Sequence, residues 1–193
     1  MKAMDKEISK NIFIKNKILT PDYFCLDMWN YKKANLQKLI TLNKLSYPII
    51  IKPTDEGSSI GVKICKNLSS LKLSSKNLFK IYKNLIFEKF IPGQEVQVAV
   101  INNKALGAIE LKPRRTFYDY KAKYQKSANT EHIMPANILK KNYKKVLKIA
   151  EKAHKSLKCK GVTRADFKFF KNKFYLLEVN TQPGMTSLSL VPE

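Results

Sequence analysis

The sequence is poor in several residue types, and arginine is the scarcest of the charged ones. Only Arg114, Arg115 and Arg164 are arginines among the 37 basic residues, and 15 acidic residues leave a formal net charge of +22. Nucleic-acid surfaces favour arginine for bidentate contacts and aromatic residues for stacking. The lysines are spread along the whole chain, which is more typical of biased codon usage than of a dedicated polyanion site. General attraction of anionic substrates is a third interpretation.

Long apolar runs and paired cysteines are also missing. No apolar run approaches the roughly 20 residues of a membrane span, and the first residues are charged rather than an apolar signal core. Cys25, Cys65 and Cys159 form neither a metal-binding spacing nor an even disulfide set. We therefore expect a cytoplasmic protein with reduced thiols and with no nucleic-acid or membrane partner.

What is present is a globular composition with mixed periodicity. The 193 residues are 44% hydrophobic, which leaves room for one large domain or two small ones. Helical spacing and alternating apolar runs succeed one another, which predicts an α+β fold with halves at residues 1–85 and 86–193. Residues 112–135 show no periodicity and predict a functional loop. The expected helices cover residues 4–17, 32–45, 74–84 and 137–157, and the expected strands cover 23–26, 49–51, 60–65, 86–90, 95–101, 106–111, 166–170 and 174–177.

Oxygen-bearing side chains follow the last apolar strand. Glu178 and Asn180 are two residues apart and would share one face of a strand. Asp166 lies in the preceding apolar run, and a turn at residues 171–173 would fold one run onto the other. Three oxygen ligands would then converge, which is the ligand type that Mg²⁺ prefers. Surface carboxylates at strand ends are the alternative interpretation.

A second candidate segment begins with Lys52 at the end of an apolar strand. A turn rich in glycine and serine follows, in which Gly57 and Gly61 would let backbone amides approach phosphate oxygens. The usual P-loop has its lysine after the glycines and a helix behind it, so a plain hairpin turn stays an alternative. Residues 88–91 could form a strand edge that holds a purine, with the carboxylate of Glu95 beyond it.

Six motifs along the chain resemble the D-alanine–D-alanine ligases, a family with the ATP-grasp fold. In order they read MDK, KPTDEGSSIGV, FEKFIPGQE, FYDYKAKY, RADF and LEVNTQPGMTSLSLVP. The resemblance covers nearly the whole chain, and FYDYKAKY and NTQPGMT are much narrower signals than the metal-ligand pattern. It implies two α+β subdomains that clasp the nucleotide between antiparallel sheets.

The resemblance assigns roles to individual residues. For the ATP phosphates, it implies that Lys6 and Lys52 bind them, that Ser58 and Ser59 lie in the loop over them, and that Lys123 reaches the γ-phosphate. For the nucleoside, it implies that Glu88, Lys89 and Ile91 form the adenine edge and that Glu95 accepts hydrogen bonds from the ribose hydroxyls. For the reaction, it implies that Asp166, Glu178 and Asn180 bind two Mg²⁺ (or Mn²⁺) ions and that Arg164 stabilises the oxyanion. For the substrates, it implies that Ser58 and Tyr124 help orient the first D-alanine and that Ser189 holds the carboxylate of the second.

The implied reaction joins two D-alanines through an acyl phosphate for peptidoglycan precursor synthesis. Tyr124 stands where dipeptide-forming members have a tyrosine, which predicts D-alanyl-D-alanine rather than a depsipeptide as product. Lys121 departs from the acidic residue usual at its position. The family's amino-terminal lobe and final helix are not matched, so we expect little ligase activity from this chain alone.

Three function classes stay open from the sequence. The first is an ATP-dependent ligase that is active alone or with a separately encoded amino-terminal lobe. Its small-molecule partners would be ATP and D-alanine, and the family's assembly is a homodimer. The second is an inactive ATP-binding remnant, and the third is a basic polyanion-binding module. Polyanion binding would collapse with salt, whereas specific nucleotide binding would persist.

Overall fold

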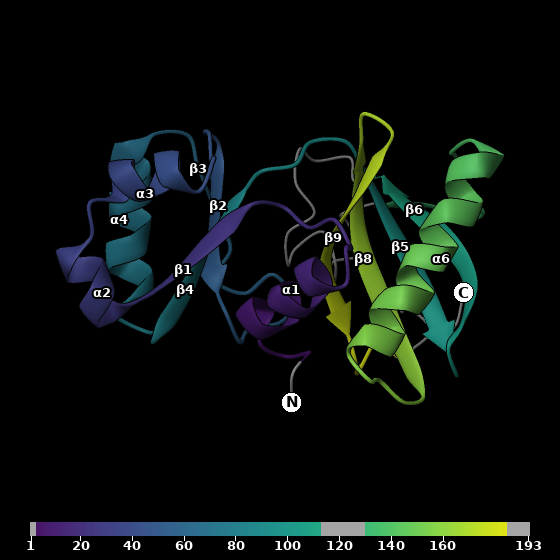
Figure 1. The fold of residues 1–193 in the computed structure, drawn as a ribbon. Coiled ribbons are helices and arrows are strands. Elements are labelled where there is room, and N and C mark those ends of the chain that lie inside the picture. The colour runs from purple at the N-terminus through teal and green to yellow at the C-terminus, as the bar shows by residue number, and fades with distance from the viewer. Residues whose placement is uncertain (1–2, 113–129, 185–193) are drawn as a thin grey trace. The chain divides into compact units, whose positions relative to one another are not determined.

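The computed structural model describes residues 3–112 and 130–184, which form two compact units (Figure 1). The small unit is Pro21–Phe90, and the large unit combines residues up to Thr20 with those from Ile91 onward. The chain passes from one unit to the other at residue 20 and again at residue 90. The second crossing is close to the expected boundary at 85, but the first was not expected and gives the first helix to the large unit.

The small unit is an antiparallel sheet with helices packed on one side. Its strand order is β1-β4-β2-β3. The strands are β1 (Tyr23–Asp27), β2 (Ile49–Pro53), β3 (Lys63–Cys65) and β4 (Asn84–Lys89), and the helices are α2 (Met28–Lys33), α3 (Leu36–Leu42) and α4 (Leu68–Leu78). Ile49, Ile51 and Phe87 enter the buried core with helix residues, and Phe24 stacks on Phe87 with ring centroids 4.7 Å apart.

The large unit is a five-stranded antiparallel sheet with a long helix across one face (Figure 1). The strand order is β7-β6-β5-β8-β9. The elements are α1 (Lys6–Lys15), β5 (Gln94–Ile101), β6 (Lys104–Lys112), β7 (Glu131–Ile133), α6 (Lys140–Ser156), β8 (Val162–Phe170) and β9 (Lys173–Asn180). Helix α6 contacts four of the strands, and α1 contacts β9.

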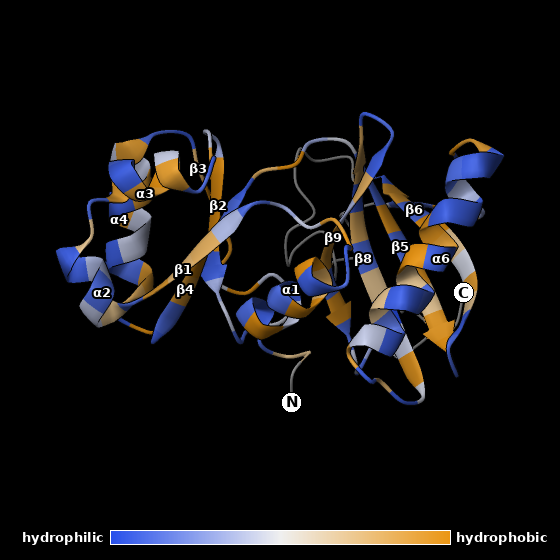
Figure 2. Cartoon of the chain, viewed as in Figure 1, coloured by the Kyte–Doolittle hydropathy of each residue, from blue (hydrophilic) through white to orange (hydrophobic). Residues whose placement is uncertain are grey.

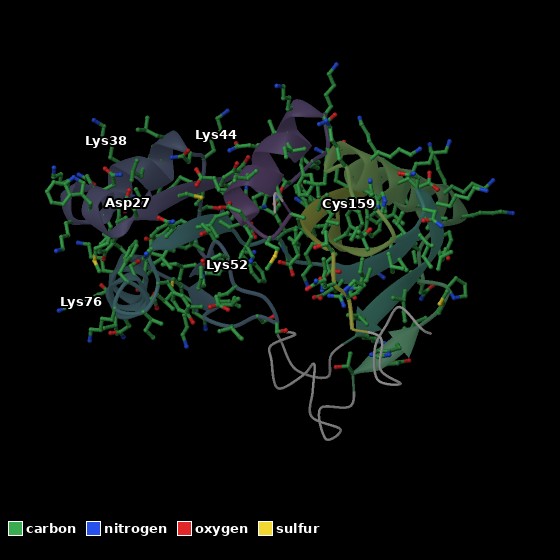
Figure 3. All side chains as sticks on the ribbon, turned by 90° about the horizontal axis from the view of Figure 1, so that it is seen from below. Asp27, Lys38, Lys44, Lys52, Lys76 and Cys159 are labelled. Carbon is green, nitrogen blue, oxygen red and sulfur yellow. The ribbon has the colours of Figure 1, made fainter. Side chains whose placement is uncertain are left out.

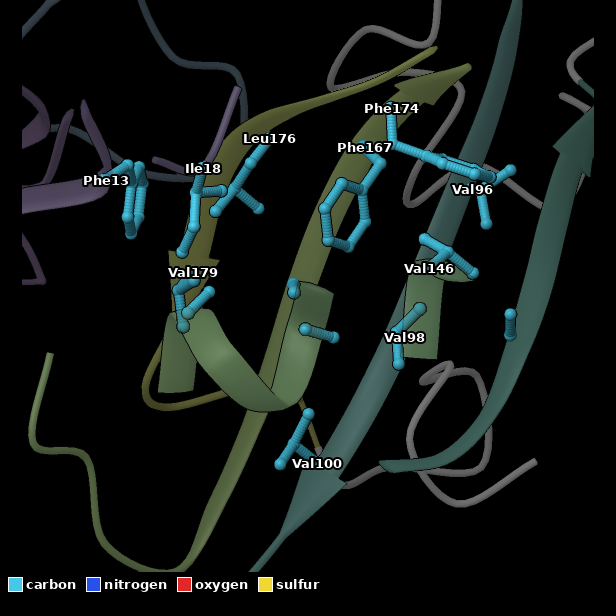
Figure 4. Close-up of a cluster of buried hydrophobic side chains, with 14 of the residues drawn as sticks. Phe13, Ile18, Val96, Val98, Val100, Val146, Phe167, Phe174, Leu176 and Val179 are labelled. Carbon is cyan, nitrogen blue, oxygen red and sulfur yellow. The ribbon is translucent and has the colours of Figure 1, made fainter. Parts of the chain in front are cut away.

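The core of the large unit lies between α6 and the sheet (Figure 4). Every second residue of β5 enters it, namely Val96, Val98 and Val100, and all three are fully buried. Val146 of α6 and Phe167 of β8 join the same cluster. Figure 2 shows polar residues along the outer side of α6, as expected of an amphipathic helix whose apolar stripe is buried.

Two tight turns fix the register of the long hairpins. Asn102 and Asn103 have φ angles of 48° and 70°, and Lys171 and Asn172 have φ angles of 48° and 59°. Two successive residues with positive φ are typical of the primed turns that match the twist of paired strands. Both hairpins were expected from the sequence, and both are confirmed by the pairing of β5 with β6 and of β8 with β9.

Short polar side chains fix where the first four helices begin. Asp5, Asp27, Asn35 and Asn67 each accept a hydrogen bond from the backbone N–H three residues later. This satisfies one of the N–H groups that a helix start leaves without an intrahelical acceptor. At Asn67 the cap is a full capping box with Ser70.

These caps explain two differences from the expected helices. The single helix expected at 32–45 is instead α2 and α3, because Ala34 is extended, with ψ of 135°, and Asn35 starts a new helix. The helix expected at 74–84 is α4, which begins earlier at the Asn67 cap. Apolar spacing alone does not reveal either boundary.

Two further expected segments differ in extent. The strand expected at 60–65 is shortened to β3, because the N–H groups of Ile60 and Val62 bond to turn carbonyls instead of to β2. The expected loop at 112–135 contains β7, which pairs with the end of β6. Within the described residues, no helix is long and apolar enough to cross a membrane.

Burial of His154 gives the large unit a pH-dependent stability. The side chain is fully enclosed, and its Nδ1 lies 2.7 Å from the Thr163 hydroxyl. Burial lowers the pKa of His154 below its ordinary value of 6.5. Below about pH 6.5 the unfolded chain therefore takes up a proton at His154 that the folded chain does not. The contribution of His154 to the free energy of unfolding is thus fully present above this pH and is lost as the pH falls below it.

We expect the free energy of unfolding to decrease between pH 6.5 and 5.5 by up to about 1.4 kcal/mol per pH unit for one proton. Urea unfolding at several pH values measures this slope. In His154→Gln the slope should shrink, because glutamine does not titrate. The matched variant His132→Gln changes an exposed histidine and should keep the parent slope. An unchanged slope in His154→Gln would contradict the assignment.

Candidate functional site

The candidate site is the face of the large unit's sheet that points away from α6. Residues that alternate with the buried apolar ones on β5, β8 and β9 gather there. We call this the polar face, and it consists of Glu95, Gln97, Arg164, Asp166, Lys168, Glu178 and Asn180.

A β-bulge at Leu177 places Glu178 and Asn180 on the polar face. Asp166 pairs with Glu178, and the register then shifts so that Leu177 is the extra residue. In an unbroken strand, Leu176 and Glu178 would point to the same side. The bulge keeps Leu176 in the core and turns Glu178 toward the face that carries Asp166. Opposed residues of an antiparallel pair lie side by side, as the metal prediction requires.

Arg164 and Asp166 form a bidentate ion pair. The Arg164 Nε donates to Asp166 Oδ1 at 2.7 Å, and a terminal nitrogen donates to Oδ2 at 2.9 Å. Asp166 is only 4% exposed. Planar fork geometry and burial make this a strong charge-assisted contact. It holds the arginine rigidly beside the carboxylate, so a metal ion at Asp166 would have to share these oxygens with Arg164.

The other two proposed metal ligands also have neighbours. Lys6 of α1 places its Nζ 3.8 Å from Glu178 Oε2, and Asn180 Oδ1 accepts from the Gln182 N–H at 3.0 Å. Two carboxylates and one amide are hard oxygen donors and fit Mg²⁺. Among the described residues, no group of three or more His, Cys, Asp or Glu side chains could hold a metal ion. Convergence of the three oxygens on one point stays a prediction.

Lys168 is a member of the polar face that the sequence reading missed. It lies directly opposite Glu95, and its Nζ is 3.0 Å from Glu95 Oε2. Both side chains are largely buried, so the lysine fixes the orientation of the proposed ribose acceptor. The only sequence signal was its position two residues after Asp166, on the same side of the strand. Gln97 was also missed, because its only sequence signal was its position two residues after Glu95, on the same side of β5.

Lys52 and Glu88 form a buried ion pair in the small unit. Their Nζ and Oε1 atoms are 3.2 Å apart, on the sheet face opposite the core residues Ile49 and Ile51. Lysines such as Lys38 are exposed (Figure 3). Burying a lysine and a glutamate carries a desolvation penalty that their attraction only partly offsets. A buried lysine is therefore a better candidate for a specific anion contact than the exposed lysines are.

The proposed adenine edge lies at the end of β4. The Lys89 N–H donates to the Asp22 carbonyl at 2.9 Å, and the Lys89 ammonium lies 3.7 Å from the exposed Asp22 carboxylate. The N–H of Lys89 is therefore already bonded, so a base at this edge would need another group. Ile91 is buried at the start of the large unit.

The proposed phosphate loop is a tight turn with left-handed serines. Ser58 and Ser59 have φ angles of 50° and 62°, and the Ile60 N–H closes the turn on the Gly57 carbonyl at 2.9 Å. Such φ values are uncommon for residues other than glycine. The sequence placed the special backbone at Gly57 and Gly61, whereas the structure places it at both serines and Gly61.

Several predicted residues lie outside the described residues. Lys123, Tyr124 and Ser189 are among them, and their proposed roles stay predictions. Arg114, Arg115 and Lys121 also lie outside the described residues.

The chain is similar to known ligases along almost its whole length. It is 58% identical to the D-alanine–D-alanine ligase of Pelagibacter ubique over 193 residues, which is 99% of this chain and 62% of that protein. The crystal structure of a D-alanine–D-alanine ligase from Bacillus anthracis matches at 34% identity with a TM-score of 0.84, over 99% of this chain and 60% of that one. The structure of that organism's ligase complexed with ATP matches at 29% identity with a TM-score of 0.82, over 99% of this chain and 59% of that one.

These matches identify the fold as ATP-grasp, as the sequence predicted. The chain spans about three fifths of the length of these relatives. The family described as D-ala D-ala ligase C-terminus matches residues 13–193. The chain therefore belongs to the family of D-alanine–D-alanine ligase carboxyl-terminal domains.

Proposed function

We propose that this chain forms the ATP- and metal-binding part of a D-alanine–D-alanine ligase, which makes D-alanyl-D-alanine for peptidoglycan precursors. One observation carries the proposal. Asp166 and Glu178 face each other across β8 and β9, and Arg164 is held beside them by a bidentate ion pair. Ligation through an acyl phosphate needs such a combination of metal ligands and a fixed cation.

Nucleotide binding is proposed for residues of both units. In the small unit, Lys52 would contact phosphates, with Ser58 and Ser59 in the loop over them. In the large unit, Lys6 would contact phosphates and Glu95 would accept from the ribose hydroxyls. The adenine edge would be Glu88, Lys89 and Ile91. The structure of a 29% identical ligase from Bacillus anthracis complexed with ATP supports ATP as the ligand.

Magnesium, or manganese, would bind Asp166, Glu178 and Asn180, and two such ions would offset the negative charge of the reacting phosphates. The carboxylate oxygen of the first D-alanine attacks the γ-phosphorus, the bond to the β-phosphate oxygen breaks, and ADP leaves. The amine of the second D-alanine then attacks the acyl carbon, loses a proton and displaces phosphate. Arg164 would donate hydrogen bonds to the oxyanion of this second step.

The remaining assignments complete the proposal. Lys123 would reach the γ-phosphate, Ser58 and Tyr124 would orient the first D-alanine, and Ser189 would hold the second. A cytoplasmic location fits the three free thiols. The part of the relatives that this chain does not match would supply the rest of the D-alanine site, either in the same polypeptide or from a separate chain.

The test is D-alanine-dependent release of phosphate from ATP. The chain would be assayed alone and after fusion to the unmatched part of the Pelagibacter ubique ligase. We expect the fusion to release phosphate only with ATP, Mg²⁺ and D-alanine, and to form D-alanyl-D-alanine. Turnover without D-alanine, or a product of another kind, would refute the substrate assignment.

The salt dependence of binding distinguishes a specific nucleotide site from the alternative, a polyanion-binding module. Specific Mg·ATP binding should change little between 50 and 200 mM salt, whereas binding through many phosphate contacts falls by about 10³–10⁵ over this range. Calorimetric titration at both concentrations measures the difference. A collapse of ATP affinity at the higher concentration would favour the polyanion module.

A further inference from the structure

The Gln97 side chain is buried on the polar face without a hydrogen bond. It is 1% exposed, and neither Nε2 nor Oε1 hydrogen-bonds to any group in residues 3–112 or 130–184. A carboxamide in this state destabilises the fold, because the interactions that it makes with water in the unfolded chain are lost. An apolar side chain of the same size would suit such a position better, so the amide points to a binding role.

The register of β5 places this amide beside the proposed metal site. Gln97 pairs directly with Asp166 on β8 and with the apolar Ile109 on β6. Opposed side chains of antiparallel strands lie about 5 Å apart at Cβ. Glu95 is two residues earlier on the same face, which is about 7 Å along the strand. Gln97 thus lies one step from Glu95 and next to Asp166.

The neighbouring polar groups are already engaged with each other. Both oxygens of Asp166 accept from Arg164, and Glu95 is paired with Lys168 at 3.0 Å. Around Gln97, the polar face therefore carries two ion pairs with a neutral amide between them. A neutral donor can contact an anionic ligand without disturbing either pair.

We propose that Gln97 is a nucleotide-contacting residue whose Nε2 donates a hydrogen bond to a non-bridging phosphate oxygen of Mg·ATP. The inference rests on the proposed function, in which Glu95 takes the ribose and Asp166 takes the metal. A nucleotide that spans these two residues passes its phosphates over Gln97. The amide then gains the partner that it lacks within the described residues of the free chain.

The test combines nucleotide affinity with the stability of the free chain. Gln97→Met keeps the length of the side chain and removes both hydrogen-bonding atoms. We expect the Kd for Mg·ATP to rise roughly ten- to a hundredfold, as for the loss of one hydrogen bond to a charged group. The Tm of the free chain should stay the same or rise, since a buried polar group without a partner is removed. Calorimetric titration and thermal unfolding measure the two effects.

Gln94→Met is the matched control on the same strand. Its Nε2 donates to Glu110 at 3.1 Å and to the Asn137 carbonyl at 3.3 Å, and its position in the alternation puts it on the face opposite Gln97. This variant should lower the Tm and leave the Kd for Mg·ATP unchanged. The two glutamine variants are thus expected to show opposite patterns.

The outcomes separate this inference from the proposed function. If the parent chain binds Mg·ATP and Gln97→Met binds it equally well, the inference is wrong and the proposed function stands. A lower Tm with unchanged affinity would show that Gln97 is a structural residue. A parent chain that does not bind Mg·ATP would overturn both.

Discussion

Replacing Lys52 with methionine is expected to raise the Kd for Mg·ATP by roughly ten- to a hundredfold, the usual cost of a lost charge-assisted contact. The same variant should lose stability on the order of 3 kcal/mol, because the Glu88 carboxylate stays buried without its ion-pair partner at 3.2 Å. Calorimetric titration gives the affinity, and urea unfolding gives the stability. The matched variant Lys38→Met removes an exposed lysine of the same unit and should change neither.

A double variant separates binding from folding. In Lys52→Met with Glu88→Gln, the uncompensated carboxylate is removed, so most of the lost stability should return. The Kd for Mg·ATP should stay high, because the phosphate contact is still absent and Glu88 itself belongs to the proposed adenine edge. If affinity recovers together with stability, Lys52 acts only through the fold and its role as a phosphate ligand is wrong.

The second large effect is expected at Asp166. Asp166→Asn keeps the size of the side chain and removes the charge that would bind Mg²⁺. We expect the increase in ATP affinity caused by Mg²⁺ to fall by at least about ten- to a hundredfold, since even outer partners of metal ligands carry effects of this size. Titration of ATP with and without Mg²⁺ measures the increase. Asp27→Asn is the control, because either residue caps the start of α2.

Arg164→Met should have a different effect from Asp166→Asn. Arg164 occupies both oxygens of Asp166 in the free chain. Its removal frees them for a cation, so the Mg²⁺ dependence of ATP binding should be preserved or strengthened. If both variants abolish the Mg²⁺ dependence alike, the ion pair supports the fold of the site and Asp166 need not be a metal ligand.

Local sequence determined the features that depend on neighbouring residues. Asn102 and Asn103 readily adopt positive φ, and Lys171 and Asn172 make the corresponding turn, so both hairpins could be predicted. Alternation of apolar and polar residues along β5 was enough to predict that Val96, Val98 and Val100 share the core face, but not that Gln97 on the other face is buried as well. The resemblance to the ligases rested on contiguous motifs, and the family match confirms it.

The composition of the polar face depended on pairing between distant segments. Lys168 and Gln97 become candidate site residues only because they pair with Glu95 and Asp166 across β5 and β8. This register cannot be read from any local sequence pattern. The passage of the chain between units at residue 20 is of the same kind, because it depends on where α1 packs. The sequence therefore predicted the site residues that belong to a motif, such as Glu95 and Asp166. It did not predict Lys168 and Gln97, which only lie on the same sheet face as these residues.

Glu178 shows most clearly what the sequence determined and what the tertiary structure decided. The sequence determined that Glu178 and Asn180 share a face, because they are two residues apart on a strand. It could not determine which face, since Leu176 shares the same spacing and belongs to the core. The bulge at Leu177 settled this, because pairing with β8 while burying Leu176 requires one extra residue before Glu178. Both conditions, the pairing of β9 with β8 and the burial of Leu176, arise only in the packed sheet.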